Sequence, residues 1–264
     1  MKKKLKKTSM LTKLGHHEHK YAGPERDIVT DLAKAFEKSP LPLAQKLSTF
    51  PRHTRRQDIA RFLVKYEIFK LNLPVNGSVI ECGVFAGGGL AGWMHFSAIL
   101  EPYNHTRRVI GFDTFEGFPG LHECDLQHGQ SGHLRKGAFS TTDTIQSEIE
   151  KLAAIHDRNR PIGHIPKIEC VRGDACLTIP KYVADHPHLL VSLLYLDFDI
   201  YAPTKTALEH ILPRVVKGGI VAFDELNCAE FPGETVALLQ TIGLERVELR
   251  RLAYDPYISY FVKS

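Results

Sequence analysis

The sequence predicts an α/β fold built on a doubly wound, mostly parallel sheet, and two observations support this prediction. From residue 78 onward, short apolar runs typical of buried strands alternate with longer segments of helical periodicity. Two of these runs, residues 193–199 and 220–225, also end in closely spaced acids. In an open α/β sheet, ligands bind outside the carboxyl ends of the strands, so such acids are expected there.

Residues 1–77 are expected to form a lysine-rich tail and a helical extension that precede the main domain. The tail covers residues 1–23, and residues 25–73 carry helical periodicity in two segments. Prolines between the segments, at positions 40, 42 and 51, predict a break. The turn at residues 74–77, Pro-Val-Asn-Gly, predicts where the extension ends.

Residues 78–264 are expected to form one domain of alternating elements. The predicted strands are residues 79–83, 108–113, 168–172, 190–197 and 219–224, and the predicted helices are residues 89–101, 143–156, 175–184, 203–216 and 233–242. The last two apolar runs, residues 246–252 and 257–262, follow one another with no helix between them. They predict a hairpin that adds an antiparallel edge to the sheet.

Residues 114–142 form a long insertion without a clear periodicity, rich in Gly, His, Ser and Thr. Such a segment inside a compact domain is usually a functional lid or a disordered loop. It follows the carboxyl end of a predicted strand, so we expect it to lie over the site. Its histidines, His122, His128 and His133, are candidate contacts for a substrate, or are simply exposed.

Composition excludes several classes of protein. The chain has 264 residues and a formal net charge of +4, but five lysines lie within the first seven residues, so the rest is nearly neutral. A nearly neutral body does not predict a nucleic-acid surface. No apolar secretion segment follows the lysines and no apolar run approaches roughly 18 residues. Five cysteines without CxxC spacing suit reduced thiols. We therefore expect a cytoplasmic enzyme.

Four acids follow the two apolar runs and are expected to converge at one edge of the sheet: Asp197, Asp199, Asp224 and Glu225. Clustered carboxylates repel one another unless a cation neutralises them, and Mg²⁺ is the simplest oxygen-preferring candidate. The alternative is that these acids cap the following helices or pair with Lys205 and Arg214.

The first predicted strand runs into a glycine-rich turn, Glu-Cys-Gly-Val-Phe-Ala-Gly from Glu81 to Gly87. This spacing is not the GxGxxG of dinucleotide-binding proteins and is closer to the E/DxGxxxG of S-adenosylmethionine (SAM) enzymes. Gly83 would permit a sharp turn, and Gly87 would let a ligand approach the following helix. Glycine-rich turns also occur without any ligand.

Two further acids lie where a nucleoside would be held. Asp113 ends the second predicted strand, about 30 residues after the glycine-rich turn, where a carboxylate can accept hydrogen bonds from ribose hydroxyls. Asp174 follows the third predicted strand, where a loop could meet an adenine. Asp174 could instead only cap the helix that begins near Ala175.

Together, five segments resemble the macrocin O-methyltransferase family: ECGVFAGG at 81–88, GFDTFEGFP at 111–119, GDA at 173–175, DFDIYAPT at 197–204 and KGGIVAFD at 217–224. The resemblance covers roughly residues 78 to 240. It implies a class I SAM-methyltransferase fold, with a Rossmann-like sheet, and a metal-dependent enzyme that methylates a sugar hydroxyl.

The resemblance also assigns roles to residues. Glu81, Gly83 and Asp113 would hold SAM, with Asp174 near its adenine. Asp197, Asp224 and Glu225 would bind Mg²⁺, and Asp199 would be the general base or a further ligand. The family usually has two aspartates where this chain has Asp224 and Glu225, so Glu234 is a candidate substitute ligand.

Two other functions stay open at this stage. A nicotinamide-dependent nucleotide-sugar oxidoreductase would use a related fold, although the GxGxxG spacing is missing. A non-catalytic SAM-binding protein would have little need for four converging acids. RNA methylation is disfavoured by the nearly neutral body. The sequence leaves open the identity of the sugar, the choice between a nucleotide sugar and a glycoside, and the oligomeric state, a homo-oligomer included.

Overall fold

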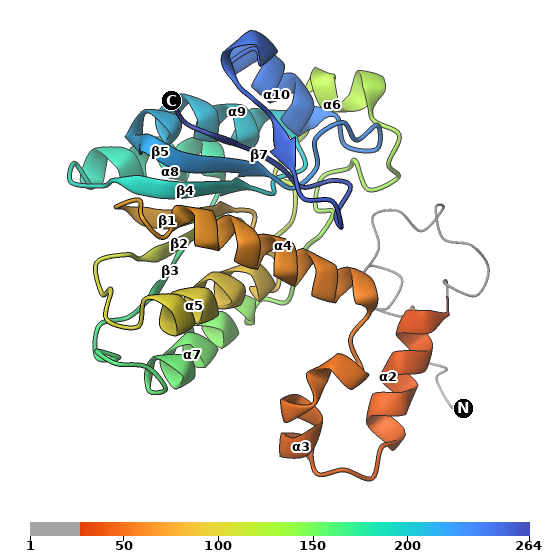
Figure 1. The fold of residues 1–264 in the computed structure, drawn as a ribbon. Coiled ribbons are helices and arrows are strands. Elements are labelled where there is room, and N and C mark those ends of the chain that lie inside the picture. Colours follow the sequence, from red (N-terminus) through yellow and green to blue (C-terminus); the bar gives the residue numbers. More distant parts are fainter. Residues whose placement is uncertain (1–26) are drawn as a thin grey trace. The chain divides into compact units, whose positions relative to one another are not determined.

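The computed structural model describes residues 27–264, apart from the side chain of His128 (Figure 1). The lysine-rich start therefore lies outside the described residues. The chain divides into two compact units between Arg61 and Phe62. The second unit includes most of the long helix α4 (Arg56–Asn72), which sequence analysis assigned to the extension.

The first unit consists of short helices: α2 (Ile28–Lys38), α3 (Leu43–Ser48), the 3-10 turn η3 (Phe50–Arg52) and the start of α4. The predicted break is present, because Pro40 and Pro42 separate α2 from α3. Lys46 fastens the two helices. Its Nζ donates a hydrogen bond to the carbonyl of Phe36 at 2.5 Å and lies 5.0 Å from the centre of the Phe36 ring.

The second unit is a seven-stranded sheet in the order β3-β2-β1-β4-β5-β7-β6. Its strands are β1 (Ser78–Cys82), β2 (Val109–Asp113), β3 (Ile168–Arg172), β4 (Val191–Leu196), β5 (Val215–Phe223), β6 (Arg250–Arg251) and β7 (Ser259–Val262). The first five are parallel, and β7 pairs antiparallel with both β5 and β6. The predicted doubly wound sheet with an antiparallel C-terminal hairpin is confirmed.

Helices cover both faces of the sheet (Figure 1). One face packs against α8 (Ala175–Asp185), α9 (Tyr201–His210) and α10 (Gly233–Thr241), and the other packs against α4, α5 (Gly88–Leu100) and α7 (Ile145–Asp157). Strand side chains alternate between the two cores. On β4, Leu194 and Leu196 face the first core, whereas Leu193 and Tyr195 face the second.

Two predicted boundaries are wrong. The helix predicted at residues 203–216 ends at His210, because Pro213 cannot donate the backbone hydrogen bond that a longer helix needs. Strand β5 therefore starts at Val215, where Lys263 beside it donates from Nζ to the carbonyl of Val215 at 2.6 Å. The predicted hairpin strand 246–252 shrinks to the two residues of β6.

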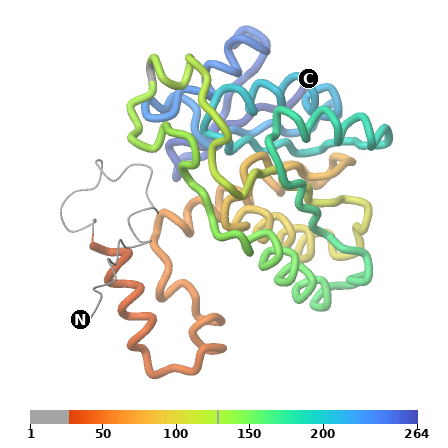
Figure 2. The backbone as a smooth tube through the Cα atoms, turned by 180° about the vertical axis from the view of Figure 1, so that it is seen from behind, coloured from red at the N-terminus to blue at the C-terminus, as the bar shows by residue number. Residues whose placement is uncertain are grey.

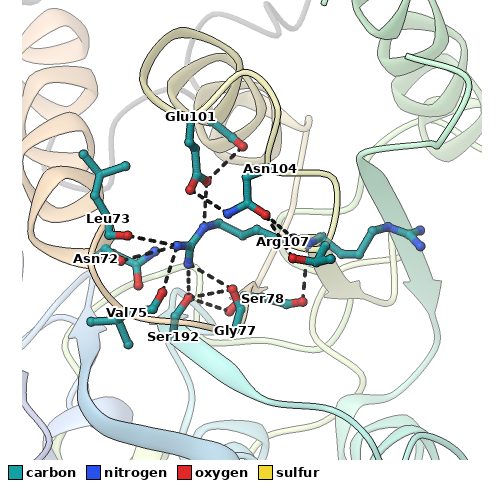
Figure 3. Close-up of polar contacts among 12 residues, drawn as sticks. Asn72, Leu73, Val75, Gly77, Ser78, Glu101, Asn104, Arg107 and Ser192 are labelled. Carbon is teal, nitrogen blue, oxygen red and sulfur yellow. Dashed lines mark hydrogen bonds and ion pairs between the residues drawn. The ribbon is translucent and has the colours of Figure 1, made fainter. Parts of the chain in front are cut away.

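The amino edge of the sheet is held by one buried arginine (Figure 3). Arg107 is 3% exposed and forms an ion pair with Glu101 at 2.6 Å. Its guanidinium also donates hydrogen bonds to the carbonyls of Gly77 at 2.9 Å and Val75 at 2.8 Å. Arg107 therefore fastens the turn between α4 and β1 to the end of α5, which fixes where β1 enters the sheet.

Candidate functional site

The ends of β1 and β4 touch at the carboxyl edge of the sheet. The N–H of Asp197 donates a hydrogen bond to the carbonyl of Cys82 at 2.7 Å. A Cβ on Gly83 would lie 1.9 Å from the Asp197 carbonyl oxygen, and Gly83 has a φ of +96°. Only glycine fits at this position. The glycine-rich turn and the first of the acids are therefore direct neighbours.

Asp113 shapes the glycine-rich turn. Its Oδ2 accepts hydrogen bonds from the N–H groups of Val84 at 2.7 Å and Phe85 at 2.8 Å, and its Oδ1 accepts one from Phe115 at 2.5 Å. These bonds hold Phe85 in a left-handed conformation, with a φ of +50°. The Oδ1 atom can accept one further hydrogen bond, and the predicted contact with a ribose remains a prediction.

Gly87 begins helix α5. It occupies the N-cap position with a φ of +83°, and a Cβ there would lie 2.6 Å from the side chain of Ile149. The next residue, Gly88, faces open space, because a Cβ on it would meet nothing within 4 Å. Helix α5 therefore starts beside a residue whose backbone no neighbouring atom covers, which suits an approaching ligand.

Asp174 caps helix α8. Its Oδ1 accepts a hydrogen bond from the N–H of Cys176 at 2.9 Å, which is the capping role that the sequence left open. The preceding residue, Gly173, donates its N–H to the carbonyl of Asp113 at 2.9 Å. The loops after β2 and β3 are thus joined beside the glycine-rich turn, while contact between Asp174 and an adenine stays a prediction.

Glu81 is buried beneath the start of α5. It is 1% exposed, and a Cβ on Gly89 would lie 1.7 Å from its Oε1 atom. Lys65 of α4 forms an ion pair with this carboxylate at 3.2 Å and also lies 4.4 Å from the centre of the Tyr195 ring. Burial raises the pKa of Glu81, and Lys65 opposes that rise. Sequence reasoning missed Lys65, because no motif marks it.

The acids after β4 and β5 come together as predicted. Asp199, Asp224 and Glu225 are buried, and Asp197 is half-buried. Burial, followed by the charges of Glu225 and Asp197, raises the pKa of Asp199 well above its usual range. The Oδ1 atom of Asp199 is buried and has no hydrogen-bond partner among residues 27–264. Asp199 also adopts a left-handed φ of +63°.

The structure does not support the alternative in which these acids only cap helices or pair with Lys205 and Arg214. The N-cap of α9 is Ile200, without a side-chain cap. Lys205 pairs with Glu209 at 3.9 Å, and Arg214 donates to the carbonyl of Pro187 at 2.9 Å. The acids instead contact other elements of the site. The hydroxyl of Tyr195 donates a hydrogen bond to Asp224.

Glu234, the candidate substitute ligand, lies inside the cluster and is fully buried. Its two carboxylate oxygens accept hydrogen bonds from the backbone N–H groups of Asp199 and Glu225. Burial, with the nearby charges of Asp197 and Asp224, raises the pKa of Glu234 well above its usual range. Glu234 thus contacts the loops that carry the predicted ligands.

The acid cluster contains side chains of the type that binds Mg²⁺, but these side chains are not arranged around a common point. Carboxylate oxygens are the ligands that Mg²⁺ prefers. The Oδ1 of Asp199 is a buried acceptor without a partner among the described residues, and a cation would satisfy it. Within the described part of the chain, however, no three His, Cys, Asp or Glu side chains are arranged to hold a metal ion. Binding of Mg²⁺ would require acid side chains to turn toward a common point.

The insertion is packed against the loop that carries Glu225. It contains helix α6 (Glu123–His128), and Asp125 of this helix accepts a hydrogen bond from the N–H of Tyr201 at 2.8 Å. Gln130 donates to the carbonyl of Ala229 at 3.1 Å. An apolar cluster joins the same segments: Phe118, Ala138, Ile200, Cys228 and Phe231. Figure 2 shows the insertion in yellow-green beside this blue loop.

The histidines of the insertion contact aromatic rings. The His122 ring lies 4.6 Å from the ring of Tyr201, and the His133 ring lies 5.1 Å from that of Phe139. The side chain of His128 lies outside the described residues. Tyr201 follows Asp199 by two positions, so His122 contacts a residue close to the acids in sequence.

All five cysteines are free. No helix within residues 27–264 is long and apolar enough to cross a membrane.

Solved structures similar to this chain include two of one enzyme. The crystal structure of CalS11, calicheamicin methyltransferase, has a TM-score of 0.87 and 32% sequence identity, over 92% of this chain and 94% of that one. The apo structure of CalS11, described as a TDP-rhamnose 3'-O-methyltransferase, has a TM-score of 0.79 and 30% identity. The O-methyltransferase NovP, at 17% identity and a TM-score of 0.57, shares the fold. These matches show a class I SAM-methyltransferase fold.

Sequence comparison points the same way. A tetracenomycin-C rhamnosyl 4'-O-methyltransferase from Streptomyces olivaceus is 26% identical over 155 residues, which are 57% of this chain and 53% of that protein. This chain thus aligns with about half the length of that curated relative. The profile of the macrocin-O-methyltransferase (TylF) family matches residues 65–236, which contain the glycine-rich turn and the acid cluster. The chain therefore belongs to the macrocin-O-methyltransferase (TylF) family.

Proposed function

We propose that this protein is a SAM-dependent, Mg²⁺-dependent O-methyltransferase that acts on a hydroxyl of a sugar. One observation carries the proposal: the glycine-rich turn at Gly83 lies in direct contact with Asp197, the first residue of the acid cluster. A methyl donor held at the turn and a hydroxyl held at the acids would be neighbours. Family membership favours methyl transfer over the hydride transfer of the oxidoreductase alternative.

The proposed donor site uses Glu81, Gly83, Gly87, Asp113 and Asp174. SAM bound there would supply a methyl group already activated by its sulfonium, so the protein mainly needs to aim an oxygen at it. Gly83 and Gly87 let the turn pack closely against Asp197 and Ile149, Gly88 leaves open space beside it, and Asp113 fixes the turn. Glu81, held by Lys65, places a buried carboxylate beneath this turn.

In the proposed acceptor site, Asp199 would take the proton of the sugar hydroxyl. The hydroxyl oxygen would bond to the methyl carbon while the bond from that carbon to the SAM sulfur breaks, and S-adenosylhomocysteine would leave. The buried Oδ1 of Asp199, which has no hydrogen-bond partner in the described part of the chain, could receive that proton. Mg²⁺ held by Asp197, Asp224 and Glu225 would lower the pKa of a bound hydroxyl and stabilise the alkoxide that develops.

The proposed substrate is a small sugar derivative. CalS11 is described as a TDP-rhamnose 3'-O-methyltransferase, and the Streptomyces olivaceus relative is described as methylating a rhamnosyl derivative of tetracenomycin C. A deoxysugar hydroxyl, presented on a nucleotide or on a finished glycoside, is therefore the first acceptor class to test. We propose that the insertion covers this acceptor and excludes water, with His122 on its inner side.

The first experiment is calorimetric titration of S-adenosylhomocysteine into the protein, once with Mg²⁺ and once with EDTA. Binding at roughly micromolar affinity in both would support the cofactor assignment. Methyl transfer is then measured by mass spectrometry with TDP-rhamnose and with rhamnosylated aglycones. Transfer that EDTA abolishes and Mg²⁺ restores supports the whole proposal. No binding under either condition would sink the methyltransferase assignment and favour a scaffold role.

A further inference from the structure

We infer that Glu234 is a positioning residue that holds the loops of Asp199 and Glu225 together. The inference rests on the proposed methyl transfer, in which Asp199 is the base. The Oε1 atom of Glu234 accepts a hydrogen bond from the N–H of Asp199 at 3.3 Å, and its Oε2 atom accepts one from the N–H of Glu225 at 3.2 Å. One carboxylate thus connects the chain after β4 to the chain after β5.

The start of α10 brings Glu234 to this place. A Cβ on Gly233 would lie 2.4 Å from the backbone nitrogen of Tyr201 and 2.5 Å from the Asp125 carboxylate. The first turn of α10 is therefore pressed against the chain that follows Asp199, and any side chain at position 233 would push it away. Glu234, the next residue, is fully buried in the interior of the site.

Asp199 needs such support because its backbone is strained. Its φ of +63° lies in the left-handed region, which non-glycine residues rarely occupy without surrounding structure to hold them there. The Oδ1 atom of its side chain has no hydrogen-bond partner among residues 27–264. Among the described residues, no hydrogen bond to Oδ1 helps to place this carboxylate, so its position depends on the backbone from which it extends, and the bond from the N–H of Asp199 to Glu234 holds that backbone.

The need for two acceptors explains why a carboxylate occupies this position among other carboxylates. Two backbone N–H groups converge on one side chain, and a carboxylate offers two acceptor oxygens and no donor. A glutamine would aim its NH₂ group at one of the two N–H groups. Glu234 thus repels its acidic neighbours but satisfies both amides, and it does so at the two loops that carry the reacting groups.

The test compares Glu234→Gln and Glu234→Ala with a matched control, Thr235→Val. Thr235 is the next residue of α10, and its Oγ1 accepts a hydrogen bond from the N–H of Asn227 at 3.0 Å. The control therefore removes a similar bond between α10 and the loop after β5, without touching Asp199 or Glu225. Amide hydrogen exchange is followed by NMR at Asp199 and Glu225, and methyl transfer is measured in parallel.

In Glu234→Ala, both amides should exchange about tenfold faster or more, and kcat should fall about 100-fold, because a displaced base loses its alignment. S-adenosylhomocysteine affinity should stay within about twofold of wild type. In Glu234→Gln, which keeps one acceptor, only one of the two amides should lose protection. If Glu234→Ala does not fold, amide exchange in Glu234→Gln still tests the inference.

The inference is overturned if exchange at Asp199 and Glu225 is no faster in Glu234→Gln and Glu234→Ala than in Thr235→Val. It is also overturned if exchange rises in Glu234→Ala while kcat stays at the level of the control. Failure of the proposed function is distinguishable from both results. It would appear as absence of methyl transfer in the wild-type protein, whereas the exchange measurement needs no substrate.

Discussion

Tyr195 donates a hydrogen bond from its hydroxyl to the carboxylate of Asp224 in the middle of the buried acid cluster. The ring of the same tyrosine lies 4.4 Å from the ammonium of Lys65, which in turn pairs with Glu81. A continuous chain of polar contacts therefore joins the glycine-rich turn to the acids. It runs through strands β1 and β4 and helix α4.

The variant Tyr195→Phe should weaken the acceptor site and leave the donor site intact. The ring and its contact with Lys65 remain, but Asp224 loses a donor whose bond to a charged group is worth about 1.5–3 kcal/mol. We expect kcat/KM to fall about 10- to 100-fold. Binding of S-adenosylhomocysteine, measured by calorimetry, should be unchanged.

The control for this variant is Tyr182→Phe, which alters a buried tyrosine on the opposite face of the sheet. It should keep kcat/KM within about threefold of wild type. If both phenylalanine variants lose activity equally, the effect of Tyr195→Phe comes from general loosening of the core and not from Asp224.

The variant Asp199→Asn should abolish most of the methyl transfer without disturbing the fold. Asparagine tolerates the left-handed φ of +63° and keeps the shape of the side chain, but it cannot accept a proton. Loss of a general base costs about 10²- to 10⁴-fold in rate. The measurement is kcat with saturating sugar, together with circular dichroism. Activity within tenfold of wild type would show that another group takes the proton.

The sequence predicted the sheet and the edge at which its acids meet because both depend on local patterns. Apolar runs mark β1, β2, β4 and the end of β5, and Asp197 and Asp224 directly follow the last two of these runs. Element ends were less predictable: one proline, Pro213, ends a helix six residues early. The roles of Lys65 and Tyr195 depend on which elements pack together in space, and no local pattern carries that information.

Local sequence patterns also could not predict what the insertion packs against or which role Asp174 has. The composition of residues 114–142 predicted an irregular segment, but the buried carboxylate of Asp125 ties it to Tyr201 after β4, and the apolar cluster around Phe231 ties it to the loop after β5. Asp174 was ambiguous because a capping aspartate and a ligand-binding aspartate occupy the same place after a strand.

Two glycines of the cofactor turn should respond differently to alanine. Gly83→Ala should destabilise the protein by about 3 kcal/mol or more, because the added Cβ would clash with the Asp197 carbonyl and φ is +96°. Gly88→Ala should leave stability within about 0.5 kcal/mol, since its Cβ meets open space. If that space receives the cofactor, Gly88→Ala should still weaken binding of S-adenosylhomocysteine about tenfold or more. Urea denaturation and calorimetry separate the two effects, and full affinity in Gly88→Ala would place the cofactor elsewhere.

Arg107→Lys should lower the free energy of unfolding by about 2 to 4 kcal/mol. Lysine keeps the charge but cannot reproduce the planar fork that reaches Glu101, Gly77 and Val75 at once (Figure 3). The neighbouring Arg108→Lys is the control, because Arg108 is partly exposed and pairs with Glu169 at 3.5 Å. It should cost less than about 1 kcal/mol. Equal losses in urea denaturation would mean that Arg107 acts only through its charge.

Lys167 should make stability depend on pH in the alkaline range. This side chain is 3% exposed, and its Nζ donates hydrogen bonds to the carbonyls of Asn104 and Arg107. Burial, with the charges of Arg160 and Arg107, lowers its pKa from 10.5 to about 8. Between those two values the unfolded chain binds more protons than the folded protein, so the contribution of Lys167 to stability rises as pH increases. Below pH about 8 the ammonium is charged in both states and its burial cost is fully present.

The measurement that checks this is the difference in unfolding free energy between wild type and Lys167→Met, at pH 7, 8, 9 and 9.5. Taking the difference removes the contributions of cysteines and tyrosines that titrate in the same range, among them Cys170, whose pKa burial raises to about 12. We expect the difference to move in favour of wild type above pH about 8 and to be flat below it. A difference that stays constant from pH 7 to 9.5 would mean that Lys167 keeps an ordinary pKa in the folded protein, because its two carbonyl partners offset the cost of burying the charge.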